Sequence, residues 1–241
     1  MQLFYMPALF ESNADFCFDE QESRHCVQVL RHKKGDILDL TDGRGFFYKA
    51  LLTEANPKKC QMRIVEQREG QALPVQIHVG IAPPKNIARF EWFLEKATEI
   101  GITEITPIST ERTERGGQLR YDRLEKILVS ALKQTIKAKL PVLNPMRSLV
   151  QVLHDKTLLE HYPARFIPYI NPDSPLLQHA YAPAMKGQNA LLLIGPEGDF
   201  THQEVQQAQE QGFLPVSLGN SILRTETAGI VVCHTINLLN T

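Results

Sequence analysis

The sequence lacks the features that mark membrane proteins, secreted proteins and bulk cationic nucleic-acid binders. No apolar run approaches the roughly 18 residues of a transmembrane helix. The start of the chain has no basic segment followed by an apolar one, so we expect no signal peptide. The 26 Lys and Arg side chains nearly balance 27 Asp and Glu, which disfavours histone-like binding by overall charge and leaves a local basic patch open.

Cysteine and histidine spacings typical of disulfide scaffolds and metal sites are also missing. Cys17, Cys26, Cys60 and Cys233 form no C-x-x-C pair, so we expect free thiols in a reducing cytoplasm, mostly as packing residues. The eight histidines show no metal-ligand spacing, and we expect no bound metal. The chain contains neither a Walker phosphate loop nor a G-x-G-x-x-G string, and it has no nucleophile elbow.

Residues 1–72 predict a small β-rich domain with one helix. Asp42 and Gly43 form a hairpin signal between apolar runs, and Asp19 with Glu22 has the spacing of a capping box. Short strands around a single helix favour a small barrel. We expect its strands at residues 37–40, 46–52 and 60–64.

Residues 73–241 predict an α/β domain, because strand and helix patterns alternate there. Residues 190–194 are apolar on both faces, as a central parallel strand covered by helices is. Gly101 is expected to end the first helix, whose apolar stripe includes Phe90 and Ala97. The other strands are expected at residues 75–81, 102–108, 165–170 and 214–218.

Charge is distributed unevenly along this second part. Residues 110–140 hold eight basic and four acidic side chains, a net of +4, whereas residues 141–241 hold five and eight, a net of −3. The basic segment is either a solvated helix face or a surface that contacts phosphates.

Two loops follow predicted parallel strands at the sheet edge where ligands bind in open α/β folds. The first loop, residues 195–201, contains two glycines and a proline, and Thr201 with Glu204 forms a capping box for the next helix. The second loop contains Arg224, followed by Thr225, which we expect to cap the last helix. Each loop is either a tight turn without a ligand or part of a site. Arg224 is either a surface charge or a group placed where negative charge develops.

Both loops resemble the signature of the RsmE family of SPOUT-superfamily methyltransferases. The matching strings are L-I-G-P-E-G at 193–198 and L-G-N-S-I-L-R-T-E-T-A at 218–228. Residues 25–43 are similar to the family's PUA-like domain, and residues 90–112 to its central stretch. The chain departs from the family at residues 133–139, which lack the E-Q-x-x-R string, and at Asp199, which replaces a glycine. Aspartate tolerates a left-handed backbone better than most residues do.

This resemblance implies a PUA-like RNA-binding β-barrel followed by a trefoil-knotted α/β domain. It implies S-adenosylmethionine as methyl donor and N3 of a uridine in small-subunit (16S) ribosomal RNA as acceptor. Arg224, Glu226 and Glu197 are the expected catalytic residues. Nine residues are expected to hold the donor: Ile170, Ile194, Gly195, Gly198, Leu218, Gly219, Leu223, Thr227 and Ala228. Six are expected to contact RNA: Arg24, Arg31, Lys33, Lys34, Arg112 and Arg115.

The resemblance also implies a homodimer through the C-terminal domain. An apolar stripe near the chain end fits either a partner or the domain's own sheet; it comprises Ala228, Val231, Val232, Ile236 and Leu239. Two other functions stay open at this point. One is a non-catalytic RNA-binding factor in ribosome assembly, and the other is a SPOUT enzyme that methylates another RNA position.

Overall fold

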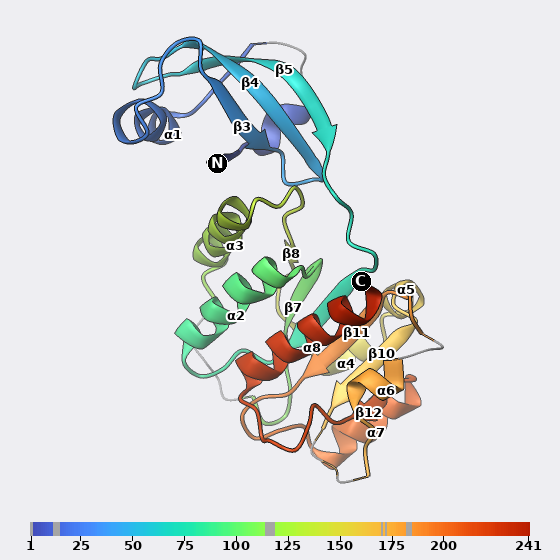
Figure 1. Ribbon diagram of the computed structural model, residues 1–241. Coiled ribbons are helices and arrows are strands. Elements are labelled where there is room, and N and C mark those ends of the chain that lie inside the picture. Colours follow the sequence, from blue (N-terminus) through green and yellow to red (C-terminus); the bar gives the residue numbers. More distant parts are fainter. Residues whose placement is uncertain (1, 12–14, 114–118, 170, 172, 182–184) are drawn as a thin grey trace. The chain divides into compact units, whose positions relative to one another are not determined.

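The computed structural model describes residues 2–11, 15–113, 119–169, 171, 173–181 and 185–241 (Figure 1). Its contacts divide the chain into two compact units. The first unit comprises Met1–Ala72 and Leu132–Leu140, and the second comprises Leu73–Ala131 and Pro141–Thr241.

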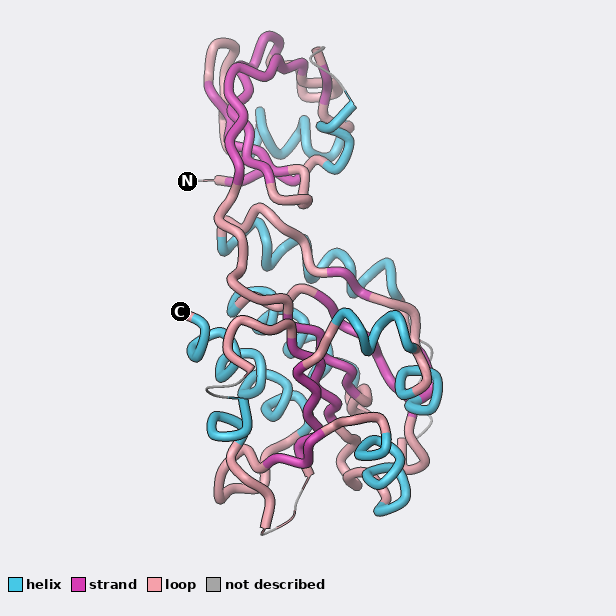
Figure 2. Tube along the Cα trace, turned by 90° about the vertical axis from the view of Figure 1, so that its right-hand side faces the viewer, coloured by secondary structure: helices cyan, strands magenta, loops and turns pink. Residues whose placement is uncertain are grey.

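A curled five-stranded sheet forms the first unit, with the strand order β1-β3-β4-β5-β2. Strand β1 runs parallel to β3, and the other neighbours are antiparallel. Figure 2 shows the strands curving around short helical segments. The elements are β1 (Leu3–Tyr5), η1 (Pro7–Glu11), β2 (Phe16–Cys17), α1 (Glu20–Arg24), the π-helix η2 (His25–Val29), β3 (Ile37–Thr41), β4 (Phe46–Glu54) and β5 (Gln61–Glu69).

Local signals in this unit are largely confirmed. The β3–β4 hairpin turns at Asp42, whose Oδ1 accepts from the Arg44 amide at 2.8 Å and whose Oδ2 accepts from the Tyr48 hydroxyl at 3.2 Å. Asp19 caps α1 by accepting from the Glu22 amide at 2.8 Å. The resulting half-barrel agrees with the small barrel predicted for this part of the chain.

The segment Leu132–Leu140 packs with the first unit, although we expected it within the second domain. The Leu140 amide donates to the Gly43 carbonyl at 2.8 Å, and the Thr41 hydroxyl donates to the Ala138 carbonyl at 3.1 Å. Lys133 is half-buried, and its Nζ lies 2.9 Å from Oε1 of Glu22. Lys133 therefore belongs to an ion pair rather than to a solvated basic face.

The second unit is built on a seven-stranded parallel sheet with the order β12-β10-β11-β6-β7-β8, in which β9 also pairs with β7. The strands are β6 (Ile77–Ile81), β7 (Glu104–Ser109), β8 (Val142–Leu143), β9 (Arg147–Ser148), β10 (Ala164–Pro168), β11 (Ala190–Ile194) and β12 (Leu214–Val216). The helices are α2 (Ile87–Ile100), α3 (Tyr121–Thr135), α4 (Leu149–Leu153), α5 (Lys156–His161), α6 (Leu177–Tyr181), α7 (His202–Glu210) and α8 (Thr225–Asn240); the end of α3, from Leu132 on, belongs to the first unit.

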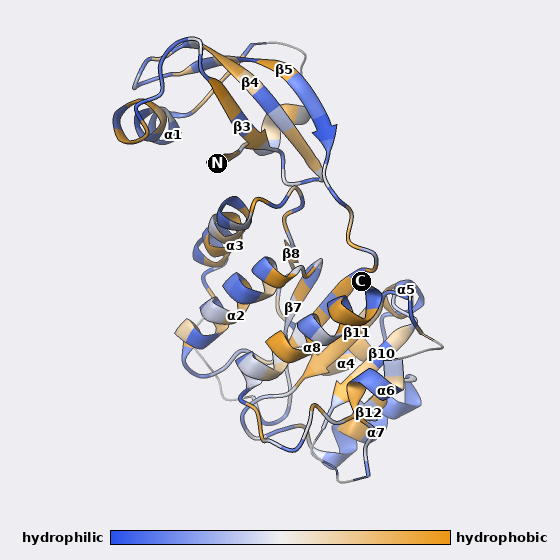
Figure 3. Cartoon of the chain, viewed as in Figure 1, coloured by the Kyte–Doolittle hydropathy of each residue, from blue (hydrophilic) through white to orange (hydrophobic). Residues whose placement is uncertain are grey.

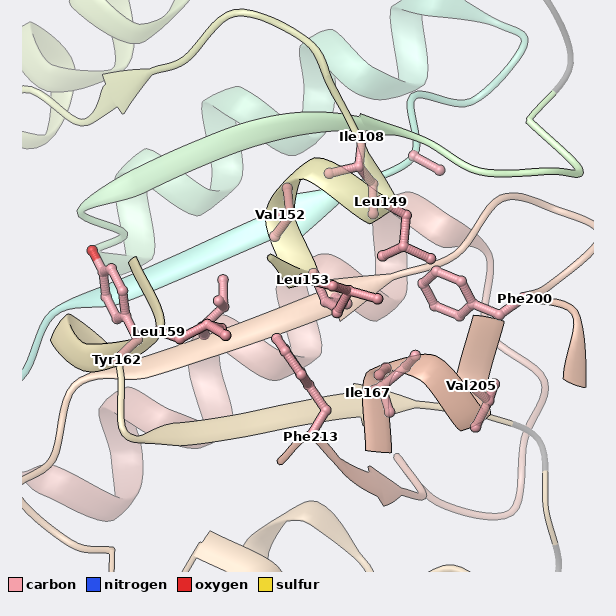
Figure 4. Close-up of a cluster of buried hydrophobic side chains, with 14 residues drawn as sticks. Ile108, Leu149, Val152, Leu153, Leu159, Tyr162, Ile167, Phe200, Val205 and Phe213 are labelled. Atoms are coloured by element: carbon pink, nitrogen blue, oxygen red, sulfur yellow. The ribbon is translucent and has the colours of Figure 1, made fainter. Parts of the chain in front are cut away.

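Helices cover both faces of this sheet, and the central strand β11 is hydrophobic throughout (Figure 3). Every residue of β6 and β11 is buried. Helix α8 packs on β6, β11 and α2. On the other face, side chains from α4, α5 and α7 meet the sheet in one apolar cluster that includes Leu153, Phe200 and Val205 (Figure 4).

The predicted α/β class with a parallel sheet is confirmed. Strand β11 has the predicted bounds. Gly101 ends α2 with φ of 118°, a left-handed conformation that favours glycine. Thr201 and Glu204 form the predicted capping box of α7.

A polar cluster is buried near the amino ends of β6 and β7. His78 is 1% exposed, and its Nε2 lies 2.7 Å from Oγ1 of Thr106. Its Nδ1 lies 3.6 Å from Oε2 of Glu104, beyond hydrogen-bond distance, while Glu104 accepts from Asn144 and Tyr162. Burial lowers the pKa of His78 to about 4, so the ring is neutral in the folded protein at pH 7.

This pKa predicts loss of stability in mild acid. Between pH 6.5 and pH 4 the unfolded chain protonates His78 and the folded chain does not, so the free energy of unfolding falls as the pH is lowered. The expected slope from this residue is about 1 kcal/mol per pH unit. Urea unfolding of wild type and His78→Gln across this range measures it. Equal slopes for the two proteins would contradict the assignment.

Candidate functional site

The candidate site lies at the carboxyl edge of the parallel sheet, where loops from neighbouring strands meet. Residues 195–201 follow β11, residues 217–224 follow β12, and residues 82–86 follow β6. Because β6 and β11 are adjacent and parallel, their loops leave the sheet on the same side. Ligands of open α/β sheets bind at this edge.

One hydrogen bond joins the two loops that carry the motifs. The Thr225 hydroxyl donates to the Gly195 carbonyl at 3.1 Å. The prediction that Thr225 caps α8 is therefore wrong. The cap residue is Arg224, without a side-chain capping bond, and Thr225 is the first helical residue. Its hydroxyl faces a carbonyl of the other loop, so it is not used as a cap.

Glu226 points into the protein beside this bond. Its side chain is 9% exposed, and Oε2 has no hydrogen-bond partner among the described residues. The Nε atom of Arg89 lies 3.8 Å from Oε1. An unpaired buried carboxylate oxygen is costly, and it is a ready acceptor for a ligand N–H group. Arg224, two residues earlier, is exposed.

Neighbouring loops hold the Gly-Pro-Glu-Gly loop in place. Exposed Glu197 accepts from the Lys85 amide at 3.3 Å. The Arg112 guanidinium donates to the Gly198 carbonyl at 2.8 Å. Asp199 has φ of 60°, the left-handed conformation expected for this replacement of glycine.

The residues expected to hold a cofactor fall into two groups. The first group is buried and is represented by Ile194, which is 3% exposed. Its carbonyl accepts from the Ala82 amide at 2.9 Å and is therefore already hydrogen-bonded to the protein backbone. Gly219 is exposed with φ of 122°, and an added Cβ would meet no atom within 4 Å. A ligand can therefore approach the backbone closely at Gly219. Leu218, Leu223, Thr227 and Ala228 are half-buried, and Ile170 lies outside the described residues.

The residues expected to contact RNA come from both units. Arg31, Lys33 and Lys34 are exposed in the loop before β3, and Arg31 has a φ of 62°. Arg24 is exposed and forms an ion pair with Glu20. Arg112 also holds Gly198, as above, and Arg115 lies outside the described residues.

Sequence reasoning missed Lys85 and Arg89. Both follow β6, and they contact the two carboxylates that the motifs supplied. The signal was available, because residues 83–86 read Pro-Pro-Lys-Asn directly after an apolar strand, at the same edge as the other loops.

The described part of the chain contains no group of three or more His, Cys, Asp or Glu side chains arranged to hold a metal ion. Its helices include none that is both long and apolar enough to cross a membrane. All four cysteines are free thiols, as expected, and Cys26, Cys60 and Cys233 are buried.

Comparisons with known proteins place both units in one functional class. A model described as an RNA methyltransferase domain matches residues 71–237, and one described as an RNA methyltransferase PUA domain matches residues 18–65. The ribosomal RNA small subunit methyltransferase E of a Synechocystis species is 32% identical over 89% of this chain and 70% of its own length.

Two crystal structures resemble the whole chain. A probable rRNA-methyltransferase from Porphyromonas gingivalis is 39% identical, with a TM-score of 0.90, over 100% of this chain and 98% of its own. The ribosomal RNA small subunit methyltransferase E from Neisseria gonorrhoeae, bound to S-adenosyl methionine, is 29% identical, with a TM-score of 0.86, over 99% and 98%.

Proposed function

The chain belongs to the ribosomal RNA small subunit methyltransferase E family, and on that premise we propose that it methylates N3 of a uridine in small-subunit ribosomal RNA with S-adenosylmethionine as donor. Ribosomal RNA methylation follows from the family, and the uridine N3 position is our more specific proposal. The observation that supports it best is the joined pair of loops, in which buried Glu226 and exposed Arg224 flank the Thr225–Gly195 bond.

The loops fit the donor at the sheet edge. Gly219 leaves its backbone open to close approach, and Leu223, just before α8, and Ala228, at the start of α8, are half-buried apolar residues. We propose that these residues, with Leu218, Gly195, Gly198 and Thr227, hold the adenosine part. When bound, the donor supplies a methyl group on a positively charged sulfur.

Glu226 is the proton acceptor that we propose. Uridine N3 carries a proton that must leave as the N3–methyl bond forms. Oε2 of Glu226 is a buried acceptor without a partner among the described residues, whereas Glu197 is exposed and holds the Lys85 amide. In this proposal Oε2 takes the proton, and Glu197 positions its loop.

Arg224 is proposed to stabilise negative charge on the uracil oxygens. It is exposed at the start of α8, where both its own charge and the helix N-terminus favour an anion. Holding the ring in line with the donor contributes further, since positioning of two reactants lowers a barrier by about 7–11 kcal/mol.

Arg224→Ala is expected to reduce methyl transfer at least about a hundredfold, because removing one preorganised stabiliser of developing charge has an effect of that order. Donor affinity, measured by calorimetry, should stay within a few-fold of wild type. Arg120→Ala removes an exposed arginine of the same unit and should retain activity. Loss of donor binding in Arg224→Ala would assign this residue to the donor pocket instead.

The first unit is proposed to bind the RNA backbone through the exposed loop that carries Arg31, Lys33 and Lys34. Such contacts release counterions, so each neutralised phosphate contributes to the salt dependence of binding. The loop is exposed and contains three bases within four positions.

Replacing Lys33 and Lys34 by Ala should weaken RNA binding and reduce the slope of log affinity against log salt by up to about 0.9 for each lost duplex phosphate contact. The matched control replaces Lys58 and Lys59, which are exposed in the same unit and change the net charge equally. Fluorescence anisotropy over a salt series measures both. The same slope change in both variants would show a general charge effect rather than a binding loop.

We also propose a cytoplasmic protein that acts as a homodimer through the second unit. Val232 and Ile236 of the apolar stripe are fully buried by their own unit, but Leu238 beside it is 62% exposed, and Val231 and Leu239 are half-buried. An isologous contact along α8 would cover this remainder.

Light scattering across a dilution series, with activity measured in parallel, tests the dimer. We expect methylation to fall as the mass falls from twice 27.3 kDa toward the monomer. Full activity of a 27.3 kDa species would contradict the requirement for a dimer.

A further inference from the structure

A cavity of about 370 Å³ with a mixed polar and apolar lining opens at the carboxyl end of β7. We call it the β7–α7 cavity. Its lining comes from the end of β7, the residues after it, the start of α4 and one side of α7: Ser109, Thr110, Glu111, Ser148, Leu149, Val150, Gln203, Glu204 and Gln207. The volume lies within the range of about 300–1,000 Å³ that is typical of small-ligand sites.

The wall of this cavity is continuous with the Gly-Pro-Glu-Gly loop. Glu204 accepts from the Glu111 amide at 2.8 Å and from the Thr201 amide at 2.9 Å. The next residue, Arg112, donates to the Gly198 carbonyl at 2.8 Å. Residues 110–112 therefore separate the cavity from the loop that we propose for the donor. A group in the cavity would lie across residues 110–112 from the Gly-Pro-Glu-Gly loop.

The polar groups available to a ligand are two carboxamides, the Ser109 hydroxyl and the Glu111 carboxylate. The hydroxyls of Ser148 and Thr110 are engaged with the Gln151 amide and with Thr113, and the carboxylate of Glu204 is used as above. Gln203 and Gln207 lie one turn apart on α7, and no hydrogen bond joins either carboxamide to another described residue. Val150, which is 54% exposed, adds apolar surface.

This chemistry fits a nucleobase better than a phosphate. The nine lining residues include no Lys or Arg, and Glu111 adds negative charge. A carboxamide donates and accepts at once, which matches the paired donor and acceptor on a base edge, as in Gln or Asn pairing with adenine. Carboxylates accept from exocyclic amino groups. RNA is read in sequence mainly through such unpaired bases.

We propose that the β7–α7 cavity binds one unpaired, amino-bearing nucleobase of the substrate RNA, close to the uridine that is methylated. This inference rests on the proposed function, because it assumes an RNA substrate at the adjacent loop. In this account Gln203 and Gln207 determine which nucleotide flanks the target.

Binding of a synthetic RNA hairpin that carries the target uridine tests this proposal. A set of hairpins, each with one abasic nucleotide near the target, is titrated by fluorescence anisotropy against wild type and against the Gln203→Ala/Gln207→Ala variant. The control is Gln209→Ala, an exposed glutamine of the same helix outside the cavity. Calorimetry of S-adenosylmethionine binding checks that each variant keeps an intact second unit.

The double variant is expected to bind the intact hairpin about 5- to 100-fold more weakly. At one position, the abasic nucleotide should weaken RNA binding by wild type and by the control variant about as much as the double substitution does. The same abasic nucleotide should leave the RNA affinity of the double variant unchanged. Uridine at that position, which lacks an amino group, should reproduce the loss. The proposal would be overturned if the losses of affinity from the double variant and from the abasic nucleotide were additive at every position. It would also be overturned if the double variant weakened binding only to assembled small subunits, since that result would assign the cavity to a ribosomal protein.

The readout is RNA affinity, so failure of the proposed reaction is seen separately. A wild-type protein that shows the predicted coupling but does not form 3-methyluridine would refute the proposed function and retain the nucleobase site. A wild-type protein that forms 3-methyluridine but shows no such coupling would refute the nucleobase site and retain the proposed function.

Discussion

The hydrogen bond from the Thr225 hydroxyl to the Gly195 carbonyl determines how the rest of the site is arranged. Gly195 directly follows β11, a strand with every residue buried, so its carbonyl has a fixed position. Holding Thr225 against it sets the rotation of the first turn of α8. As a result Glu226 is directed inward and Arg224 lies exposed. A carboxylate and a guanidinium two residues apart thereby face different environments.

Cross-loop contacts then fix the remaining groups. Glu197 is held by the backbone after β6, Glu226 lies near Arg89 from the same region, and Gly198 is held by Arg112 after β7. Segments that are far apart in sequence meet here because the carboxyl ends of parallel strands all lie at one edge of the sheet. The same edge brings together two carboxylates and basic groups, which can take up a proton and stabilise negative charge.

Features decided within a few residues were predictable from the sequence. The bounds of β11, the stop at Gly101, the Thr201–Glu204 capping box and the left-handed Asp199 all follow from local pattern and backbone preference. Features decided by distant partners were not. Thr225 was expected as a cap, but its hydroxyl bonds a residue 30 positions earlier. Lys133 was expected in a basic surface, yet it pairs with Glu22, 111 positions away.

The site shows the same division. Motif resemblance supplied Arg224, Glu226 and Glu197. The contacts of Lys85 and Arg89 with two of these carboxylates depend on the sheet, which brings the β6 loop and the start of α2 to the same edge. Periodicity also gave no indication that Leu132–Leu140 returns to the first unit, because that placement depends on hydrogen bonds to Gly43 and Thr41.

The most direct test of the central claim is mass spectrometry of nucleosides from small-subunit ribosomal RNA of cells that lack this protein. The account predicts that one 3-methyluridine is missing, that it returns when the wild-type gene is restored, and that other modified nucleosides are unchanged. Undiminished 3-methyluridine in the deletion strain, with a different methylated nucleoside lost in its place, would contradict the proposed reaction.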